Sequence, residues 1–237
     1  MDYFGELYYR CFKTKLEERA EEETRRAIEL MDKPKTVLDV GCGWGRHLHY
    51  LLNWGIDAWG IEPNPFFVEV FRERYPMWKD RIIQTTLQDA YVFKQFGAVL
   101  SLWTSIGWDE SASAEESLFD KFSQFLLPGG QLLIDVDNLQ GWQAHFCKRW
   151  WERVEGGYVL DKHDLRGNIL TTNRLFLLGD SQYNVRRQLK LYSLDELQNM
   201  AEDHELFLKM AYRDLTGNPF QKESARIVAV FEKISAA

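Results

Sequence analysis

The chain has 237 residues, which is enough for one α/β domain with a sizeable core, and its formal net charge is −7. This charge argues against a general nucleic-acid binder, because neutralising phosphates requires clustered Lys and Arg, and the basic residues here are scattered. The three cysteines, Cys11, Cys42 and Cys147, have neither the spacing of metal ligands nor the even number that a disulfide framework requires. The sequence shows no signal peptide and no apolar run of membrane length, so we expect a cytoplasmic protein that does not enter the membrane.

Residues 1–35 are predicted to form a helical lead to the domain. From about residue 14 to residue 31, apolar side chains recur at helical spacing within a highly charged stretch. The recurring positions are Leu16, Ala20, Ala27 and Leu30. This spacing is typical of an amphipathic helix that packs one face against a core.

A strand-like run at residues 36–40 is followed by Gly41, Gly43 and Gly45, and a helical pattern then covers residues 45–54. Glycines at alternate positions let the backbone turn sharply and leave no Cβ between the main chain and a ligand. A strand, a glycine loop and a helix in this order usually bind a nucleotide-like molecule.

The residues of this loop argue against a phosphate ligand. The dinucleotide fingerprint needs a third glycine where this chain has Arg46, and the Gly-Lys-Ser/Thr ending of a phosphate-binding loop is absent. Asp39, just before the loop, would repel a phosphate, because like charges in a partly desolvated site are costly. It favours a cationic ligand instead. S-adenosylmethionine (SAM), which carries an ammonium and a sulfonium and no phosphate, has this chemistry.

Strand and helix patterns then alternate along the chain. The segments lie at residues 57–61, 65–75, 82–86, 97–102, 115–126 and 131–136. Such alternation predicts a parallel sheet covered by helices, in which ligands bind beyond the carboxyl ends of the strands. Asp39, Glu62, Asp89 and Trp103 all fall at such ends, so we expect them to surround one site.

Residues 148–192 change this pattern. Extended segments at 151–155, 158–164, 168–178 and 182–191 are separated by short, hairpin-like turns. No linker sets them apart, so we expect an antiparallel lid between the fifth strand and the last helix, within a single domain of residues 1–237. Ser193 and Glu196 form the capping box that begins that helix. Exposed strands in the insertion could pair between subunits, so both a monomer and a homodimer stay open.

The chain resembles the class I SAM-dependent methyltransferases over nearly all of its length. Besides the glycine loop, the resemblance rests on Gly60-Ile61-Glu62-Pro63, Gln88-Asp89-Ala90, the segment 99–108 and the segment 127–135. A narrower resemblance, to a bacterial and archaeal group of small-molecule methyltransferases, rests on three further motifs. These are Thr104-Ser105-x-Gly107-aromatic, Trp150-Trp151-Glu152 and Asn218-Pro219-Phe220-x-x-x-Ser224-x-Arg226.

The resemblance implies a Rossmann-like fold, with a seven-stranded, mostly parallel sheet that has helices on both faces. Its last two strands, at residues 206–214 and 225–233, would form an antiparallel hairpin. The implied cofactor is SAM, with S-adenosylhomocysteine as product. The three loop glycines would approach its methionine part, Asp39 its cationic end, Glu62 its ribose hydroxyls, and Asp89 its adenine amine. The full set of predicted cofactor-binding residues is Asp39, Gly41, Cys42, Gly43, Gly45, Glu62, Pro63, Asp89, Ala90, Leu102 and Trp103.

Methyl transfer requires little acid–base chemistry, because the sulfonium is already a good electrophile and alignment is the main contribution of the protein. A general base is needed only when the acceptor must first lose a proton. The candidate bases are His145, His163 and Tyr192, with Asp109 and Glu152 behind them. None has a partner at a diagnostic spacing, so positioning is preferred over base catalysis.

Substrate recognition is assigned to the loop after the fourth strand and to the insertion. The predicted residues are Thr104, Ser105, Trp108, Asn138, Trp150, Trp151 and Arg187. Tryptophans offer a large apolar surface with one donor each, which suits an apolar or cationic substrate. For several of them the competing interpretation is a place in the core. Arg187 could meet a substrate carboxylate, and a solvated strand face is its alternative.

Several alternatives stay open at this point. Asp135, Asp137 and Asn138, with Asp109, resemble the acidic Mg²⁺ site of catechol-type O-methyltransferases, but the other motifs match the metal-independent group better, so no metal is expected. The favoured function is transfer of a methyl group from SAM to a nitrogen or oxygen of a small molecule. A methyltransferase acting on a protein or RNA, and a SAM-binding protein without methyl transfer, are the alternatives.

Overall fold

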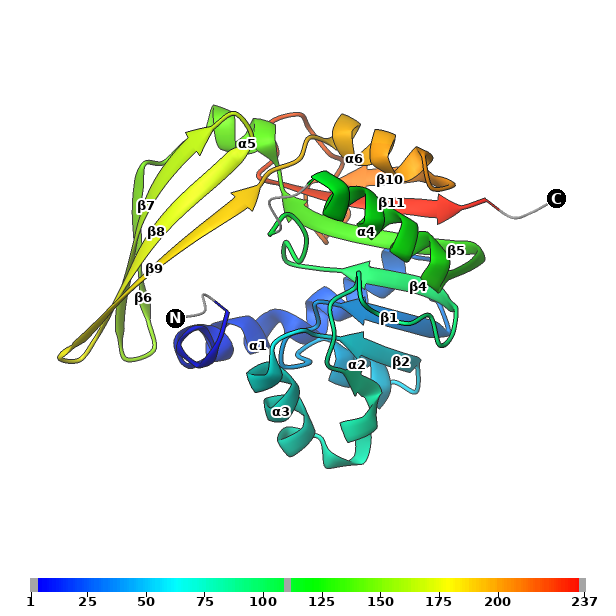
Figure 1. Cartoon of the computed structure of the whole chain (residues 1–237), viewed down its shortest axis with the longest axis horizontal. Coiled ribbons are helices and arrows are strands. Elements are labelled where there is room, and N and C mark those ends of the chain that lie inside the picture. Colours follow the sequence, from blue (N-terminus) through cyan, green and yellow to red (C-terminus); the bar gives the residue numbers. More distant parts are fainter. Residues whose placement is uncertain (1–3, 109–111, 235–237) are drawn as a thin grey trace.

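The computed structural model describes residues 4–108 and 112–234, and for residues 112–117 it describes the backbone only. Two sheets make up the strand framework. Figure 1 shows a central sheet covered by helices and a second sheet standing at one side of it. The order of the central sheet is β10-β11-β5-β4-β1-β2-β3, and the order of the second sheet is β6-β7-β8-β9.

The central sheet is parallel except at one side. Its strands are β1 (Thr36–Val40), β2 (Asp57–Ile61), β3 (Ile82–Ile83), β4 (Phe96–Ser101), β5 (Leu126–Asp137), β10 (Leu206–Tyr212) and β11 (Arg226–Lys233). β11 pairs antiparallel with both β5 and β10, whereas the pairs of β1 with β2 and β4 are parallel. The carboxyl ends of β1, β2 and β4 therefore lie along one edge, where the sequence places its candidate site.

Helices cover both faces of the central sheet with apolar side chains, with one exception. The helices are α1 (Glu6–Leu30), α2 (Leu48–Asn53), α3 (Pro65–Arg74), α4 (Ala112–Phe125), α5 (Leu139–Ala144) and α6 (Leu194–Glu202). The exception is α5, whose Leu139 and Trp142 pack with residues of the second sheet. One apolar cluster joins the sheet to α4 and α6 through Phe122 and Leu197. The other joins it to α1, α2 and α3 through residues such as Ala27, Leu48 and Phe71. The predicted fold class is thereby confirmed.

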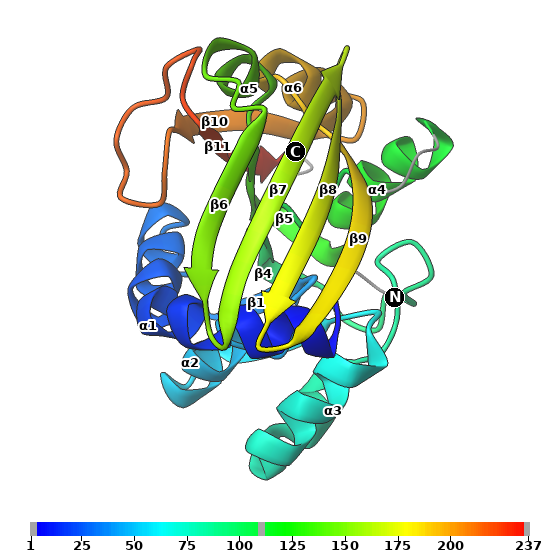
Figure 2. The ribbon, with the colours of Figure 1, turned by 90° about the vertical axis from the view of Figure 1, so that its left-hand side faces the viewer.

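The second sheet is antiparallel throughout and lies between β5 and α6 in the chain. Its strands are β6 (Arg149–Val154), β7 (Gly157–Arg166), β8 (Ile169–Leu178) and β9 (Ser181–Lys190). Burial alternates along β7, as expected for a sheet with one covered face. Phe12 and Leu16 of α1 pack against Val159 and Phe176 on that face. Figure 2 shows the amino-terminal part of α1 running beneath the ends of these strands.

Local differences from the sequence-based expectations are small but touch the site. α1 begins at Glu6, two turns before the predicted start, because Tyr8 and Phe12 belong to the cluster under the second sheet. β3 has only two residues, and the short helix α5 was not predicted. Among the described residues, no helix is long and apolar enough to cross a membrane.

Candidate functional site

Two adjoining cavities open at the carboxyl ends of the parallel strands. The first, of about 890 Å³, is lined by the loops that follow β1, β2, β3 and β4. The second, of about 570 Å³, lies between α1, α5 and the covered face of the second sheet. Both share part of their walls. The shared residues are Phe4, Tyr8, Leu16, Trp103, Thr104 and Trp108.

The glycine loop forms one side of the first cavity. Gly41 and Gly45 have φ angles of 68° and 75°, in the left-handed region that favours glycine. A Cβ on Gly41 would lie 2.7 Å from the Cβ of Ser105, and one on Gly45 would lie 2.1 Å from the ring of Phe71. The loop can therefore pack between its neighbours only without side chains at these positions.

Asp39 is buried beneath this loop and lines the first cavity. Its Oδ2 atom makes no hydrogen bond within the described part of the chain. Burial raises the pKa of Asp39 to about 7; the charge of Arg46 opposes this shift and that of Glu62 adds to it. A buried carboxylate with an unsatisfied oxygen is a site where a cationic group would be stabilised.

Glu62 connects the second strand to the glycine loop. Its Oε2 accepts a hydrogen bond from the backbone nitrogen of Gly43, and its Oε1 accepts one from that of Asn64, both at 2.8 Å. A carboxylate oxygen is an acceptor only, which is the group that a ligand hydroxyl requires. Glu62 and Pro63 both line the first cavity, as does Cys42. Glu62 therefore has two roles: it holds the glycine loop in place, and it contributes a carboxylate to the wall of the cavity.

The loop after β3 is oriented differently from the sequence-based expectation. Asp89 is exposed, its Oδ2 accepts from the hydroxyl of Thr86 at 2.8 Å, and it lies outside the described walls of both cavities. Thr86, Leu87 and Gln88 line the first cavity instead. Ala90 is buried in the hydrophobic core. At this edge the structure therefore offers a threonine and a glutamine, not the predicted carboxylate.

The loop after β4 separates the two cavities. Trp103 and Thr104 have φ angles of 58° and 60°, which is strained for residues other than glycine. The backbone nitrogen of Trp103 donates to Asp135 Oδ2 at 3.1 Å, and that of Thr104 donates to the carbonyl of Asp135 at 2.8 Å. Leu102 also lines the first cavity, and its carbonyl accepts a hydrogen bond from the hydroxyl of Ser105 at 2.7 Å. The end of β5 thus stabilises the unusual backbone of this loop.

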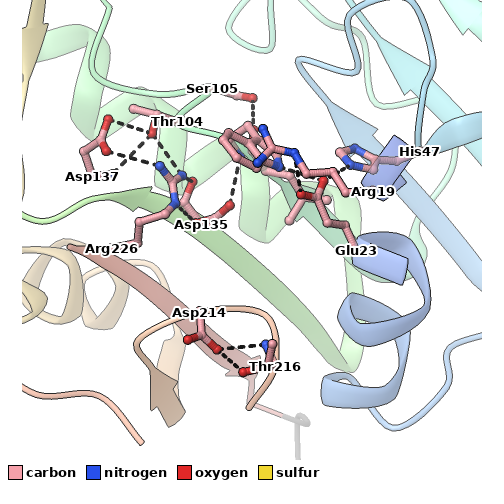
Figure 3. A network of polar contacts seen from close by, with 12 residues as sticks. Arg19, Glu23, His47, Thr104, Ser105, Asp135, Asp137, Asp214, Thr216 and Arg226 are labelled. Atoms are coloured by element: carbon pink, nitrogen blue, oxygen red, sulfur yellow. Dashed lines mark hydrogen bonds and ion pairs between the residues drawn. The ribbon is translucent and has the colours of Figure 1, made fainter. Parts of the chain in front are cut away.

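Arg226 of β11 supplies the counter-charge for the acids at the end of β5. Figure 3 shows it between Asp135, Asp137 and Thr104. Its Nε donates to Asp135 Oδ1 at 2.6 Å, its Nη1 to Asp137 Oδ1 at 3.2 Å, and its Nη2 to the hydroxyl of Thr104 at 3.1 Å. The acids that resemble a Mg²⁺ site therefore bind a guanidinium, and Asp109 lies outside the described residues. Within those residues, no group of three or more His, Cys, Asp or Glu side chains could hold a metal ion.

Glu23 of α1 joins the lead helix to this loop and to the glycine loop. Its Oε2 accepts from the indole of Trp103 at 2.9 Å and from Arg46 at 2.7 Å, and it lies 3.1 Å from Nε2 of His47. Burial would raise the pKa of Glu23, but the hydrogen bond with His47 and the charge of Arg46 lower it to about 2. Burial, with the charge of Arg46, lowers the pKa of His47 to about 4. At neutral pH the carboxylate is ionised and the imidazole is neutral.

The second cavity contains two of the three predicted catalytic residues. His163 is buried, with Nδ1 3.0 Å from the hydroxyl of Thr172, and burial lowers its pKa. His145 is exposed at the end of α5 and lines the same cavity. Tyr192 is fully buried in the hydrophobic core, outside the described walls of both cavities, so an acceptor in either cavity would not face it.

The predicted substrate residues are divided by the structure. Thr104, Trp108, Trp150 and Arg187 line the second cavity, and Ser105 lines the first. Two residues lie elsewhere in the described structure. Asn138 is buried and donates to the carbonyls of Lys222 and Ser224, and Trp151 is 65% exposed on the outer face of the second sheet.

Of the residues on α1, the sequence suggested Tyr9 and Arg10 as cofactor or lid residues, with a core or surface role as the alternative. Both lie outside the described walls of the two cavities. The sequence did not indicate Tyr8, Arg19 or Glu23 of the same helix. Tyr8 lines both cavities, and Arg19 lies over the ring of Trp103, 4.0 Å from its centroid. The spacing of apolar residues along a helix does not show whether its charged residues face a binding site or solvent. The sequence of α1 therefore gave no sign that its charged residues line a site. Arg46 could have indicated a contact with α1, since an arginine inside a glycine loop is unusual. Its partner Glu23 lies 23 residues earlier in the chain, so the sequence does not reveal the pair.

Comparison with known proteins gives matches to methyltransferases of small molecules and to a tRNA U34 carboxymethyltransferase of Idiomarina loihiensis, which is 29% identical over 45% of this chain and 34% of that protein. Residues 37–130 match the family model described as "Methyltransferase domain". A dTDP-3-amino-3,4,6-trideoxy-alpha-D-glucopyranose N,N-dimethyltransferase of Streptomyces venezuelae is 29% identical over 101 residues, which is 42% of this chain and 41% of that protein. The alignments span less than half the length of the curated relatives that the chain matches.

Solved structures show the same fold over almost the whole chain. A SAM-dependent methyltransferase from Clostridium acetobutylicum superimposes with a TM-score of 0.82 at 11% identity, covering 96% of each chain. The sugar N-methyltransferase KedS8 from a Streptoalloteichus species has a TM-score of 0.74 at 21% identity, covering 99% of this chain and 95% of that one. At these identities the likeness is one of fold.

Proposed function

We propose that this chain, a class I SAM-dependent methyltransferase by its domain match and its fold, transfers a methyl group from SAM to an amine of a small polar molecule. The observation that supports it best is the pair of joined cavities. One has the acids and the glycine loop that suit SAM, and the other is a separate space for an acceptor. An oxygen acceptor is the second candidate, because the same geometry accommodates a hydroxyl.

The residues of the first cavity fit the cofactor. Asp39 offers a buried oxygen without a hydrogen bond in the described structure, which suits the cationic methionine end. Glu62 lines the same cavity, and its two acceptor oxygens are the groups that suit a pair of ribose hydroxyls. A Cβ built on Gly43 would meet nothing within 4 Å, so its backbone borders open space. Thr86 and Gln88 line the cavity at the loop where Asp89 was expected, and we expect them to meet the base.

SAM, when bound, supplies an electrophilic methyl group, and the chain supplies alignment. Trp103 and Trp108 stand in the shared wall, so an acceptor that packs on them lies beside the cofactor cavity. The indole of Trp108 donates to the carbonyl of Thr104 at 2.6 Å, and that of Trp103 donates to Glu23, so both rings are held in place. Fixed walls of this kind reduce the entropy lost on alignment.

Charge in the second cavity favours an amine over an ammonium. Arg19, Arg174 and Arg187 line it, and nearby cations lower the pKa of a bound ammonium, which produces the neutral nucleophile. His163 also lines this cavity, but burial lowers its pKa and makes it a weaker base, so the proposal relies on alignment and not on proton transfer to this residue. Two of the three curated relatives are N,N-dimethyltransferases of dTDP-amino sugars, which supports an amine acceptor, whereas the third acts on U34 of tRNA.

The test is an incubation of the protein with methyl-labelled SAM and a panel of amino sugars, amino acids and matching alcohols. We expect label in an amine product and formation of S-adenosylhomocysteine. Calorimetry with S-adenosylhomocysteine checks the first cavity separately. If neither SAM nor S-adenosylhomocysteine binds, the proposal is wrong; if both bind and only hydroxyl compounds are methylated, the amine acceptor is wrong.

A further inference from the structure

The outer face of the second sheet, which is turned away from both cavities, carries a band of apolar side chains. The strand register places Trp151, Leu160 and Leu175 side by side on β6, β7 and β8. Tyr158 and Leu177 form the next row, and the ring centroids of Trp151 and Tyr158 lie 5.9 Å apart. Trp151 is 65% exposed and Tyr158 is 46% exposed, so this apolar band faces solvent. Figure 2 looks onto this face, with the four strands in front of α1.

Cations flank the apolar band. Arg149, Lys162 and Arg186 lie in the adjoining row of the sheet, which we call the cationic row. Arg153 stands at the other side of the band, opposite Tyr158 on the neighbouring strand. All four cations are exposed. Arg149 and Lys162 are direct cross-strand partners, and like charges in this position destabilise a sheet.

Negative charge is scarce on the same face. Among the outward-facing residues of the four strands, which the structure describes in full, the acid is Asp164. It pairs with Arg166 at 2.9 Å, so this acid does not balance the cationic row. The outer face is therefore positive, although the formal net charge of the whole chain is −7.

The positive charge and the apolar band together restrict what can cover this face. A second copy of the chain, paired symmetrically through it, would bring the same cations against one another. RNA supplies anions, but its bases stack on flat aromatic faces. The band consists mostly of leucines, and the rings of Trp151 and Tyr158 are tilted by 57°. Trp, Tyr and Leu bordered by Lys and Arg suit an anionic membrane surface, where aromatic rings lie at the level of the headgroups.

We propose that the outer face of the second sheet attaches the protein to the surface of an anionic lipid bilayer. The apolar band enters among the headgroups, and the cationic row meets the lipid phosphates. Attachment of this kind lies on the surface and needs no spanning segment. The second cavity is lined from the covered face of the sheet, by residues such as Asp161 and Arg174, so it stays on the side away from the lipid. This inference does not rest on the proposed function.

Co-sedimentation of the full chain with vesicles tests the proposal. One set of vesicles contains phosphatidylcholine alone, and the other contains phosphatidylcholine and phosphatidylglycerol in equal amounts, both in about 0.1 M salt. Each Lys or Arg near an anionic surface strengthens binding by about fivefold. We therefore expect the chain to bind the anionic vesicles about tenfold or more tightly than the neutral ones, and to bind them less tightly as the salt concentration rises.

Variants of the outer face identify the surface that binds. The triple variant Arg149→Gln, Lys162→Gln, Arg186→Gln should bind anionic vesicles about tenfold or more weakly. Because these cations repel one another across the strands, it should unfold at the same urea concentration as the parent or a higher one, which separates lost binding from lost folding. Trp151→Ser should weaken vesicle binding by about tenfold, since it removes the most exposed part of the apolar band. The matched control makes the same change of charge at three exposed lysines outside the second sheet, which are Lys33, Lys35 and Lys79.

Three results with vesicles would each overturn the proposal. These are equal binding to both vesicle types, no binding to anionic vesicles at millimolar lipid, and the same loss of binding in the control as in the triple variant. A concentration-dependent dimer of the parent that Trp151→Ser abolishes would also overturn it, because a second copy would then cover this face. If RNA, and not anionic vesicles, binds the parent and fails to bind the triple variant, the face is an RNA surface and the proposal is wrong.

Discussion

Asp39 carries an electrostatic cost that a bound cation can offset. Its pKa is raised from 3.8 to about 7 in the folded protein, mainly by burial. Between these values the folded state holds a proton that the unfolded state has lost, so the free energy of unfolding falls as pH rises through this window.

Asp39→Asn removes the titration. We expect the variant to be more stable than the parent at pH 8, by up to about 1.4 kcal/mol for each pH unit between the two pKa values, and similar to it near pH 4. Urea unfolding without ligand at the two pH values measures this, and equal destabilisation at both would contradict it.

The same carboxylate should make cofactor affinity depend on pH. A cationic ligand prefers ionised Asp39, so binding below pH 7 must release its proton. We expect affinity for SAM to weaken by up to about tenfold per pH unit as pH falls from 7 toward 5. Asp39→Asn should bind weakly with a flat profile over this range. Calorimetry in buffers with different ionisation enthalpies measures the released proton, and a steep profile in the variant would assign the dependence to another group.

At the scale of elements, Arg226 links β11 to β5 and to the loop after β4. Arg226→Gln leaves Asp135 and Asp137 without their shared cation and weakens the support of the strained Trp103–Thr104 backbone. We expect a loss of about 3 kcal/mol in unfolding free energy, as for a broken buried ion pair, and weaker binding of S-adenosylhomocysteine. Arg226→Lys should recover part of the stability and less of the binding, because a lysine cannot bind all three partners.

Lys209→Gln is the control for this variant. Lys209 lies on β10, beside β11, and pairs with Asp32 and Glu232 at the surface, where an ion pair contributes at most about 1 kcal/mol. If Arg226→Gln changed stability and binding no more than this control does, Arg226 would have no role in positioning the loop.

The sequence was sufficient for the elements whose apolar pattern is local. β1, β2 and β4 lie within a residue or so of their predicted bounds, because each is a short apolar run ended by a turn residue. The loop after β3 was harder, because the direction of each side chain in an irregular loop has no period to reveal it, and Gln88 lines the cavity where Asp89 was expected. Asp135 and Asp137 resemble metal ligands until β11 is known to bring Arg226 beside them.

At the scale of the whole molecule, α1 ties the two cavities together. Near its middle, Glu23 binds the glycine-loop residues Arg46 and His47 and the indole of Trp103. Closer to its start, Thr14 and Lys15 bond Glu155 and Glu152 of the second sheet and its turn. These partners come from distant parts of the sequence, which explains why α1 looked like a simple lead helix. A disturbance at Glu23 should therefore affect the glycine loop and the wall between the cavities together.

Acid should cause such a disturbance. The pKa of His47 is lowered from 6.5 to about 4 in the folded protein, so as pH falls the unfolded state takes up this proton first. The free energy of unfolding should therefore fall between pH 6.5 and 4, by up to about 3 kcal/mol from this group. The pKa of Glu23 is lowered from 4.5 to about 2, so its contribution is complete above pH 4.5 and is lost as pH falls toward 2.

His47→Gln separates the two groups, because glutamine can still donate to Glu23 but does not titrate. We expect the variant to lose about 1 kcal/mol at pH 7.5, from a poorer hydrogen bond, and to lose less further stability than the parent as pH falls to 4. Urea unfolding at intervals across this range measures the difference in slope. His204→Gln is the control, since His204 lies just beyond α6, outside the described walls of both cavities. The prediction is wrong if the free energy of unfolding changes with pH equally in the parent and in His47→Gln, and less steeply in His204→Gln. In that case the acid sensitivity does not arise where α1 meets the glycine loop.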